Sequence, residues 1–296
     1  MKILLFGKNG QLGWELQRSL APLGDVVALG STDTGGDFRD PDALAATVRA
    51  IAPQWVVNAA AYTAVDRAES ERELAFAINA HAVGVLARQV KALSAWLVQF
   101  STDYVFDGSG DRPWTEADAP APLNVYGSSK LEAEDLIRST GCRHLILRTS
   151  WVYAARGNNF AKTMLALLRS RDSLSVVDDQ IGAPTGAELL ADVTAHACRL
   201  AAHQPELAGV YHCVAAGETS WHGYARHIAA FARRHGEPLR VEPEAIQPIR
   251  SSAYPQQAVR PKNSRLDTTK VRTAFGVSLP EWQAPLDRCL AELLGH

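Results

Sequence analysis

Ile3-Leu-Leu-Phe-Gly7-Lys-Asn-Gly10-Gln-Leu-Gly13 opens the chain with a short apolar run followed by three glycines at intervals of three residues. The apolar run predicts a buried strand, and Leu12, Leu16 and Leu20 then recur at helical spacing. A glycine loop between a strand and a helix lets a pyrophosphate approach the backbone and the positive helix end. The stretch therefore predicts a dinucleotide-binding βα unit. The alternative is a plain strand–helix turn that happens to use glycine.

Strands and helices alternate along the first 150 residues. Pro41 after Asp40 marks a helix start, because aspartate caps a helix end and proline fits the first helical position. The sequence predicts further strands at 26–29, 55–57, 96–100 and 144–147, and further helices at 72–93 and 126–139. Apolar strands that alternate with helices predict an α/β fold, a Rossmann-type doubly wound parallel sheet with helices on both faces.

The pattern loosens after Trp151, which predicts a second and smaller unit. Helices are expected at 160–169, 187–202, 222–235 and 281–294, and short strands near 174–177 and 210–213. Five prolines between 237 and 265 predict an irregular loop that can reach a ligand. We therefore expect residues 1–150 to form an NAD(P)-binding Rossmann domain. Residues 151–296 are expected to form mainly a substrate-binding lobe, from which some segments can return to the sheet.

The composition excludes several classes of protein. The 296 residues are 47% hydrophobic and 21% charged, as in ordinary globular proteins, and the net charge of -2 argues against a nucleic-acid partner. No apolar run is long enough to span a membrane, and the short apolar start before Gly7 does not fit a signal peptide. Four cysteines without a Cys-x-x-Cys pair are expected to be free thiols. The sequence predicts a cytoplasmic protein with no membrane or nucleic-acid partner.

Tyr126-Gly-Ser-Ser-Lys130 places a tyrosine and a lysine four residues apart, and hence on one face of a predicted helix. A nearby ammonium favours the phenolate and so lowers the pKa of a tyrosine. Such a tyrosine can protonate the alkoxide that forms when a hydride reaches a ketone, and the lysine can bind the nicotinamide ribose hydroxyls. Taken alone, this spacing is most often a solvated helix face.

Ser101 and Thr102 follow the fourth predicted strand, at the edge of an open sheet where ligands bind. The Thr102 hydroxyl can donate a hydrogen bond to a substrate carbonyl and polarise it, although a turn cap would use the same residues. The glycine loop, Thr102, Tyr126 and Lys130 together stand in the chain order of a short-chain dehydrogenase.

The loop after the second predicted strand bears on the choice of cofactor. An acidic residue there usually binds the adenosine ribose, but this chain has Gly30 followed by Ser31 and Thr32. Without a carboxylate at this position, nothing repels the 2′-phosphate of NADPH. We therefore expect the protein to accept NADPH, and a preference for NADPH over NADH is a further possibility that the loop raises. The alternative is that Asp33 or Asp37 takes the acidic role.

The predicted cofactor site draws on the glycine loop, the ends of the second and third strands and the helix of Tyr126. Asp37 and Phe38 are placed near the adenine, and small residues after the third strand let the cofactor pass close to the sheet edge. The full set is Gly7, Asn9, Gly10, Gln11, Leu12, Gly13, Ser31, Thr32, Asp37, Phe38, Ala59, Ala60, Ala61, Tyr62, Thr63, Tyr126 and Lys130.

At these residues the sequence resembles the dTDP-4-dehydrorhamnose reductase family over nearly its whole length. The matching stretches are Leu5-Phe-Gly-Lys-Asn-Gly-Gln-Leu-Gly-Trp-Glu15, Val57-Asn-Ala-Ala-Ala-Tyr-Thr-Ala-Val-Asp66, Ser101-Thr-Asp-Tyr-Val-Phe106, Pro122-Leu-Asn-Val-Tyr-Gly127, Arg148-Thr-Ser-Trp-Val-Tyr153, Gly157-Asn-Asn-Phe160, Asp179-Gln-Ile-Gly-Ala-Pro-Thr-Gly186 and Arg260-Pro-Lys-Asn-Ser264. The resemblance implies hydride transfer from NADPH or NADH to C4 of dTDP-4-dehydro-L-rhamnose, with Tyr126 as the proton donor. It implies a dTDP-sugar site made by Val65, Thr102, Asp103, Tyr126, Trp151, Arg260 and Asn263.

The resemblance also implies a homodimer that holds Mg2+ between its subunits. Glu15, Glu188 and Glu292 match the metal-binding positions, and ordinary surface charge is the alternative for all three. The family often has an acidic residue where Gly30 stands, and its absence puts strict use of NADH in doubt.

Three related functions remain as alternatives. A sugar-nucleotide dehydratase needs a second carboxylate after Thr102-Asp103, where this chain has Tyr104. A 4-epimerase would hold its nicotinamide tightly and need no added reductant. A non-catalytic binding subunit, similar to the regulatory subunit of methionine adenosyltransferase, has no need of Tyr126 and Lys130.

Overall fold

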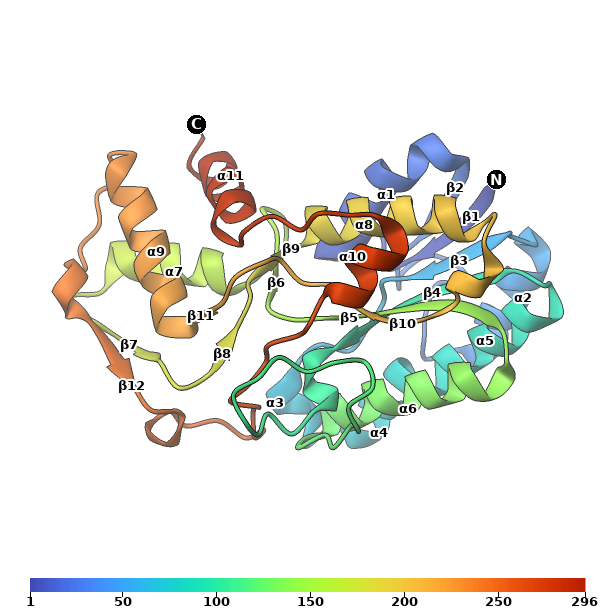
Figure 1. Ribbon diagram of the computed structural model, residues 1–296, viewed down its shortest axis with the longest axis horizontal. Coiled ribbons are helices and arrows are strands. Elements are labelled where there is room, and N and C mark those ends of the chain that lie inside the picture. The colour runs from blue at the N-terminus through green and yellow to red at the C-terminus, as the bar shows by residue number, and fades with distance from the viewer. Residues whose placement is uncertain (296) are drawn as a thin grey trace.

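A parallel sheet of six strands forms the centre of the computed structural model, which describes residues 1–295 (Figure 1). Its strands are β1 (Lys2–Phe6), β2 (Asp25–Leu29), β3 (Trp55–Asn58), β4 (Trp96–Thr102), β5 (Arg143–Thr149) and β10 (Gly209–His212). Their order is β10-β5-β4-β3-β1-β2, and every neighbouring pair is parallel. The direction of winding reverses between β1 and β3, and ligands of such sheets bind at the carboxyl ends of the strands beside this point. The predicted fold class is confirmed.

Alternation of side chains along the strands places a layer of helices on each face of the sheet. Ile3 and Leu5 belong to a core with α1 (Gln11–Leu20) and α8 (Ala187–Ala201). Leu4 and Phe6 belong to the opposite core, with α2 (Pro41–Ile51), α5 (Ala82–Ala92) and α6 (Val125–Thr140). The two layers lie above and below the sheet in Figure 1. Strand β10 and helix α8 come from the second half of the chain, so the sheet domain is not limited to residues 1–150.

The helical stretch predicted over 72–93 is confirmed, and it contains one π turn that helical periodicity does not reveal. Helix α4 (Arg72–Phe76) is followed by a π-helical segment, Ala77–His81, before α5 begins. The π turn buries Asn79, whose amide bonds both the backbone N–H and the carbonyl of Tyr62, at 2.8 and 3.0 Å, and the hydroxyl of Ser129 at 3.0 Å. The wider turn thereby joins the loop after β3 to helix α6, a local feature that helical periodicity does not record.

The smaller lobe has its own apolar core between α7 (Phe160–Ser170), α9 (Trp221–Arg234) and α11 (Gln283–Leu294). Strands β7 (Leu174–Val177) and β12 (Ile246–Ile249) pair in parallel beside them. The expectation that 237–265 is wholly irregular is wrong at β12, where Pro248 is tolerated because the strand pairs on one side only. The shorter elements are α3 (Val65–Ala68), α10 (Thr269–Phe275), β6 (Val152–Tyr153), β8 (Ile181–Gly182), β9 (Thr185–Gly186) and β11 (Thr219–Ser220).

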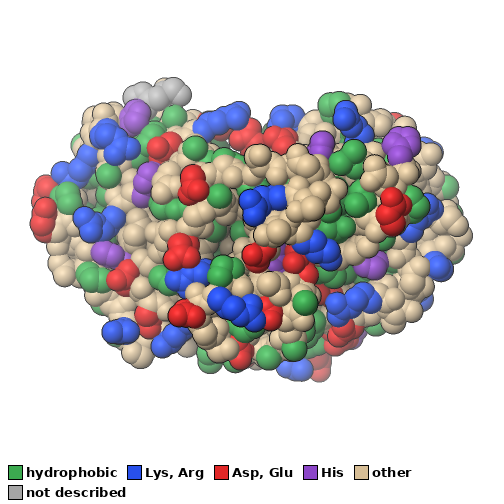
Figure 2. Space-filling model, in the orientation of Figure 1, with side chains coloured by type: hydrophobic (Ala, Val, Ile, Leu, Met, Phe, Trp, Pro, Cys, Tyr) green, Lys and Arg blue, Asp and Glu red, His purple; other side chains and the backbone are tan. Residues whose placement is uncertain are grey.

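The surface and the helices are consistent with the composition. Acidic and basic side chains are interspersed on the face shown in Figure 2. Among residues 1–295, no helix is both long enough and apolar enough to cross a membrane.

Candidate active site

Helix α6 carries Tyr126 in its first turn and Lys130 one turn later. Asn124 caps the helix by accepting a hydrogen bond from the Gly127 N–H at 2.8 Å, and its amide donates to the carbonyl of Val259 at 2.8 Å. The cap therefore fixes the start of the helix and also ties it to the C-terminal part of the chain. Lys130 is 3% exposed, so the predicted solvated helix face is excluded for this residue.

Burial controls the protonation of both residues. It raises the pKa of Tyr126 above its usual value of about 10, and the nearby carboxylate of Asp103 raises it further. Burial lowers the pKa of Lys130 to about 8. The hydrogen bond with Thr102 partly opposes the rise in the pKa of Tyr126, and a lowering of that pKa by the Lys130 ammonium stays a prediction. A neutral phenol is nonetheless the form that can donate a proton.

Thr102 stands at the carboxyl end of β4, directly before a short 3-10 turn. Its hydroxyl accepts a hydrogen bond from the Tyr104 N–H at 3.1 Å and donates one to Asp103 Oδ1 at 3.0 Å. Asp103 is buried, which raises the pKa of its carboxyl to about 6. Thr102 thus caps the turn, as the alternative interpretation proposed, while it remains beside Tyr126, to which its hydroxyl is hydrogen-bonded.

A cavity of about 510 Å³ opens at the switch point of the sheet, between the glycine loop and the loops after β2 and β3. Of the predicted cofactor residues it is lined by Gly7, Asn9, Gly10, Ser31, Asp37, Phe38, Ala59, Ala60, Ala61 and Tyr62. Seven others lie outside its lining: Gln11, Leu12, Gly13, Thr32, Thr63, Tyr126 and Lys130. The cavity has the shape and position that an extended dinucleotide needs, with backbone N–H groups of the glycine loop and the start of α1 at one side.

Two basic residues near this cavity were not among the predicted site residues. Arg39 lines it and forms a bidentate pair with Asp37, at 3.0 and 2.7 Å. Lys8 contacts Asp33 at 2.5 Å, and the same carboxylate accepts the Gly30 N–H at 2.7 Å. Both acidic residues that could have replaced the missing carboxylate are therefore already paired. A basic residue in the loop after the second strand is the signal that could have identified Arg39.

Arg260 and Trp151, two of the predicted substrate residues, lie outside the helices and strands. Arg260 donates to both oxygens of Asp66, at 3.0 and 2.6 Å, and so connects the C-terminal loop to α3, which begins with Val65. Trp151 has a left-handed backbone, with φ 49°, and its ring stacks on Trp221 at 3.7 Å. Such a conformation is strained for a bulky residue and persists at sites where the surrounding structure enforces it.

Asn263 uses its side chain inside the protein. It is 2% exposed, and its amide donates to the carbonyls of Ser109 and Arg112, at 3.4 and 2.7 Å. Its side-chain oxygen accepts from the N–H of Arg265 at 3.2 Å. These contacts hold the 109–112 loop in place, beside the turn that carries Thr102.

The three glutamates of the predicted metal site gather around one cavity. Glu15, Glu188 and Glu292 line it together with Arg18 and Arg288. Burial and the neighbouring Glu188 raise the pKa of Glu15, while Glu188 pairs with Arg288 at 2.9 Å. Within residues 1–295 of a single chain, no group of three or more His, Cys, Asp or Glu side chains is arranged to hold a metal ion.

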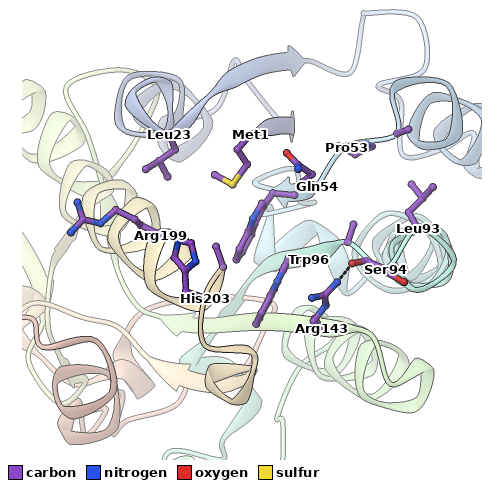
Figure 3. Close-up of a pocket in the computed structure, with 14 residues that line it drawn as sticks. Met1, Leu23, Pro53, Gln54, Leu93, Ser94, Trp96, Arg143, Arg199 and His203 are labelled. Atoms are coloured by element: carbon purple, nitrogen blue, oxygen red, sulfur yellow. Dashed lines mark hydrogen bonds between the residues drawn. The ribbon is translucent and has the colours of Figure 1, made fainter.

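A second cavity, of about 710 Å³, lies at the opposite end of the sheet (Figure 3). It is lined by the first residues of three strands, Trp55, Trp96 and Arg143. Helix α2 ends here in the left-handed residue Ala52, and the left-handed Ser94 follows the end of α5. The Arg143 guanidinium bonds the Ser94 carbonyl. Helix C-termini present carbonyls and negative partial charge, so the dinucleotide site belongs at the other end.

Comparison with known proteins agrees with this geometry. A family model described as the RmlD substrate binding domain matches residues 1–294. The dTDP-4-dehydrorhamnose reductase of Escherichia coli (strain K12) is 54% identical over 295 residues, covering 99% of this chain and 98% of that protein. A solved reductase of Clostridium acetobutylicum has a TM-score of 0.90 at 35% identity, covering 100% of both chains. The Bacillus anthracis reductase in complex with NADP has a TM-score of 0.89 at 34% identity, over 98% of this chain and 99% of that one. The chain therefore belongs to the dTDP-4-dehydrorhamnose reductase family.

Proposed function

We propose that this chain reduces the C4 keto group of dTDP-4-dehydro-L-rhamnose with NAD(P)H and yields dTDP-L-rhamnose. The observation that carries the proposal is the convergence of Thr102, neutral Tyr126 and buried Lys130 at the switch-point edge of the sheet. Full-length similarity to reductases of this name supports the choice of substrate. Residues 1–150 provide most of the NAD(P) site, and residues 151–296 provide mainly the sugar-nucleotide site.

Three side chains perform the reaction around a bound nicotinamide, which supplies the hydride. Thr102 donates a hydrogen bond to the C4 carbonyl oxygen and polarises it. Tyr126 donates its phenolic proton to the same oxygen as negative charge develops there. Lys130 binds the nicotinamide ribose hydroxyls and stabilises the phenolate that Tyr126 leaves behind. Val65, Asp103, Trp151 and Arg260 surround the sugar nucleotide, and Asn263 supports them by holding the 109–112 loop.

The proposed reaction is tested by the loss of absorbance at 340 nm with NADPH or NADH and dTDP-4-dehydro-L-rhamnose, together with identification of the product. Oxidation of the cofactor that depends on the sugar nucleotide is expected. Binding of either cofactor without any turnover would instead favour the non-catalytic binding subunit. Conversion of the sugar without consumption of reductant would favour an epimerase or a dehydratase. A dehydratase is disfavoured by Tyr104, whose ring packs edge-on against Tyr126 at 5.9 Å where a second carboxylate would be needed.

Arg39 supports a preference for NADPH. Replacement of Arg39 with alanine is expected to raise the Kd for NADPH about tenfold and leave that for NADH unchanged, because only NADPH carries a 2′-phosphate for a charge-assisted bond. The measurement is a fluorescence titration with each cofactor, repeated by calorimetry with 2′,5′-ADP and 5′-AMP. Arg49→Ala is the matched control, since Arg49 lies on α2 and contacts Gln89. An equal change for both cofactors would mean that Arg39 only holds Asp37.

The assembly and location of the enzyme are further parts of the proposal. A homodimer with Mg2+ at Glu15, Glu188 and Glu292 requires groups from a second subunit, because Arg18 and Arg288 offset these carboxylates within one chain. Analytical ultracentrifugation with and without a chelator tests whether the protein is a dimer and whether the dimer depends on a metal ion. The four cysteines are free thiols, which supports a cytoplasmic, reducing environment.

A further inference from the structure

A fully buried ion pair lies directly beneath the helix that carries Tyr126. Glu134 and Arg148 are 0% and 1% exposed. Arg148 donates two hydrogen bonds to this carboxylate, Nε to Oε1 at 2.9 Å and Nη2 to Oε2 at 2.6 Å. Such a pair is expensive to desolvate and is weak evidence for stability by itself, so its retention calls for a functional reason.

The partners of Glu134 place it at the edge of the sheet that forms the active site. Its Oε1 also accepts a hydrogen bond from the Ser101 hydroxyl at 2.6 Å. Ser101 and Arg148 face each other in the register of β4 and β5, and Thr102 is the next residue of β4. One carboxylate therefore holds helix α6 against the two strand ends that flank the reacting groups.

The same carboxylate lies in line with the catalytic residues of its own helix. Tyr126, Lys130 and Glu134 are each four residues apart, and hence share one face of α6. Lys130 has no hydrogen bond or ion pair with any of residues 1–295, and the charge of Glu134 favours its ammonium form against burial. Within the part of the chain that the structure describes, no other acidic side chain acts on Lys130 in this way.

The remaining charged and titratable groups near Glu134 do not replace this function. Arg138, one turn further along α6, approaches Glu134 Oε2 at 3.8 Å. His212 of β10 lies 3.5 Å from Arg148, and burial together with that arginine lowers its pKa to about 3, so it stays neutral. His144 at the start of β5 is half-buried, which lowers its pKa. Glu134 is thus the acidic member of a cluster that otherwise contains only basic residues.

We propose that Glu134 is a positioning residue of the reductase: it sets α6 against the ends of β4 and β5, and its charge keeps Lys130 an ammonium. This inference rests on the proposed function for the role of Lys130. In this proposal Glu134 touches neither cofactor nor substrate, but it controls the pH range in which Lys130 can act.

Glu134→Gln in the full-length protein tests the proposal. Loss of the carboxylate lowers the pKa of Lys130. As the pH rises, the variant therefore loses its ammonium at a lower pH than the wild type does. The alkaline limb of kcat/KM is expected to move down by about one pH unit, the lower end of the effect of a nearby opposite charge. The pH above which NADPH affinity falls is expected to move equally. That second readout needs no sugar substrate, so failure of the proposed reaction and failure of this inference are distinguishable.

Two further variants keep the test decisive if the Glu134→Gln substitution leaves Arg148 unpaired and the protein unfolds. Glu134→Gln with Arg148→Gln also removes the positive charge that disfavours the ammonium, so it is expected to show a downward shift that is smaller than that of Glu134→Gln alone. Glu134→Asp withdraws the carboxylate by one methylene and is expected to give a smaller shift. Glu132→Gln is the control, because Glu132 points to His81 and not to Lys130. An alkaline limb that stays at the wild-type pH in whichever variant folds would overturn the proposal.

Discussion

Tyr126→Phe is expected to slow the reduction by about 10²–10⁴-fold, the usual contribution of a general acid, while NADPH still binds. The substitution removes one hydroxyl from a half-buried ring and leaves its packing against Tyr104 unchanged. Burial keeps the phenol neutral, and in the proposed mechanism this hydroxyl donates the proton to the C4 oxygen.

Single-turnover decay at 340 nm measures this effect free of product release. Tyr104→Phe is the matched control, since it removes the hydroxyl of the neighbouring tyrosine and is expected to keep the rate within about tenfold. NADPH titration of both variants shows whether the site is intact. A Tyr126→Phe protein that binds NADPH and reduces the sugar at the wild-type rate would exclude Tyr126 as the proton donor.

Gly13→Ala is expected to disturb both the fold and the cofactor site. A Cβ at position 13 would lie 2.0 Å from the carbonyl oxygen of Gly7 and 2.6 Å from its carbonyl carbon. Gly7 cannot retreat, because its φ is 87° and it packs against the backbone of Ala59. Helix α1 must therefore move away from the loop. Overpacking of this kind lowers the free energy of unfolding by about 1–3 kcal/mol.

The same movement displaces the N–H groups that face the pyrophosphate, so the Kd for NADPH is expected to rise at least about tenfold, or about 1.4 kcal/mol. Thermal unfolding and a fluorescence titration measure the two effects. Gly10→Ala serves as the comparison, because its Cβ would lie 3.4 Å from the Gly7 oxygen and leaves α1 in place. It is expected to unfold near the wild-type temperature. Wild-type stability and affinity in Gly13→Ala would contradict the packing argument.

The order of strands and helices in the sheet domain could be predicted because it depends on local periodicity. Buried strands such as β1 and β4 are apolar throughout most of their length, and the cap at Asp40 with Pro41 marks the start of α2. The sequence alone missed β12, because a strand that contains a proline is recognised only beside its partner β7. It also missed the π segment Ala77–His81, which is stabilised by Tyr62 and Ser129, contacts that lie far away in the sequence.

The residues of the candidate site likewise fall into those that the sequence alone could identify and those that it could not. The glycine loop and the Tyr126–Lys130 spacing could be recognised because each is a short local pattern whose chemistry follows from its own residues. Arg39 could not be chosen as a site residue without knowledge of the cavity that it lines. The importance of Glu134 depends on Ser101 and Arg148, which the sheet places next to it. The sequence alone was thus enough to propose which groups react. Their protonation was decided by the tertiary structure, because burial and the distance to other charges set a pKa, and both arise only when distant segments pack together.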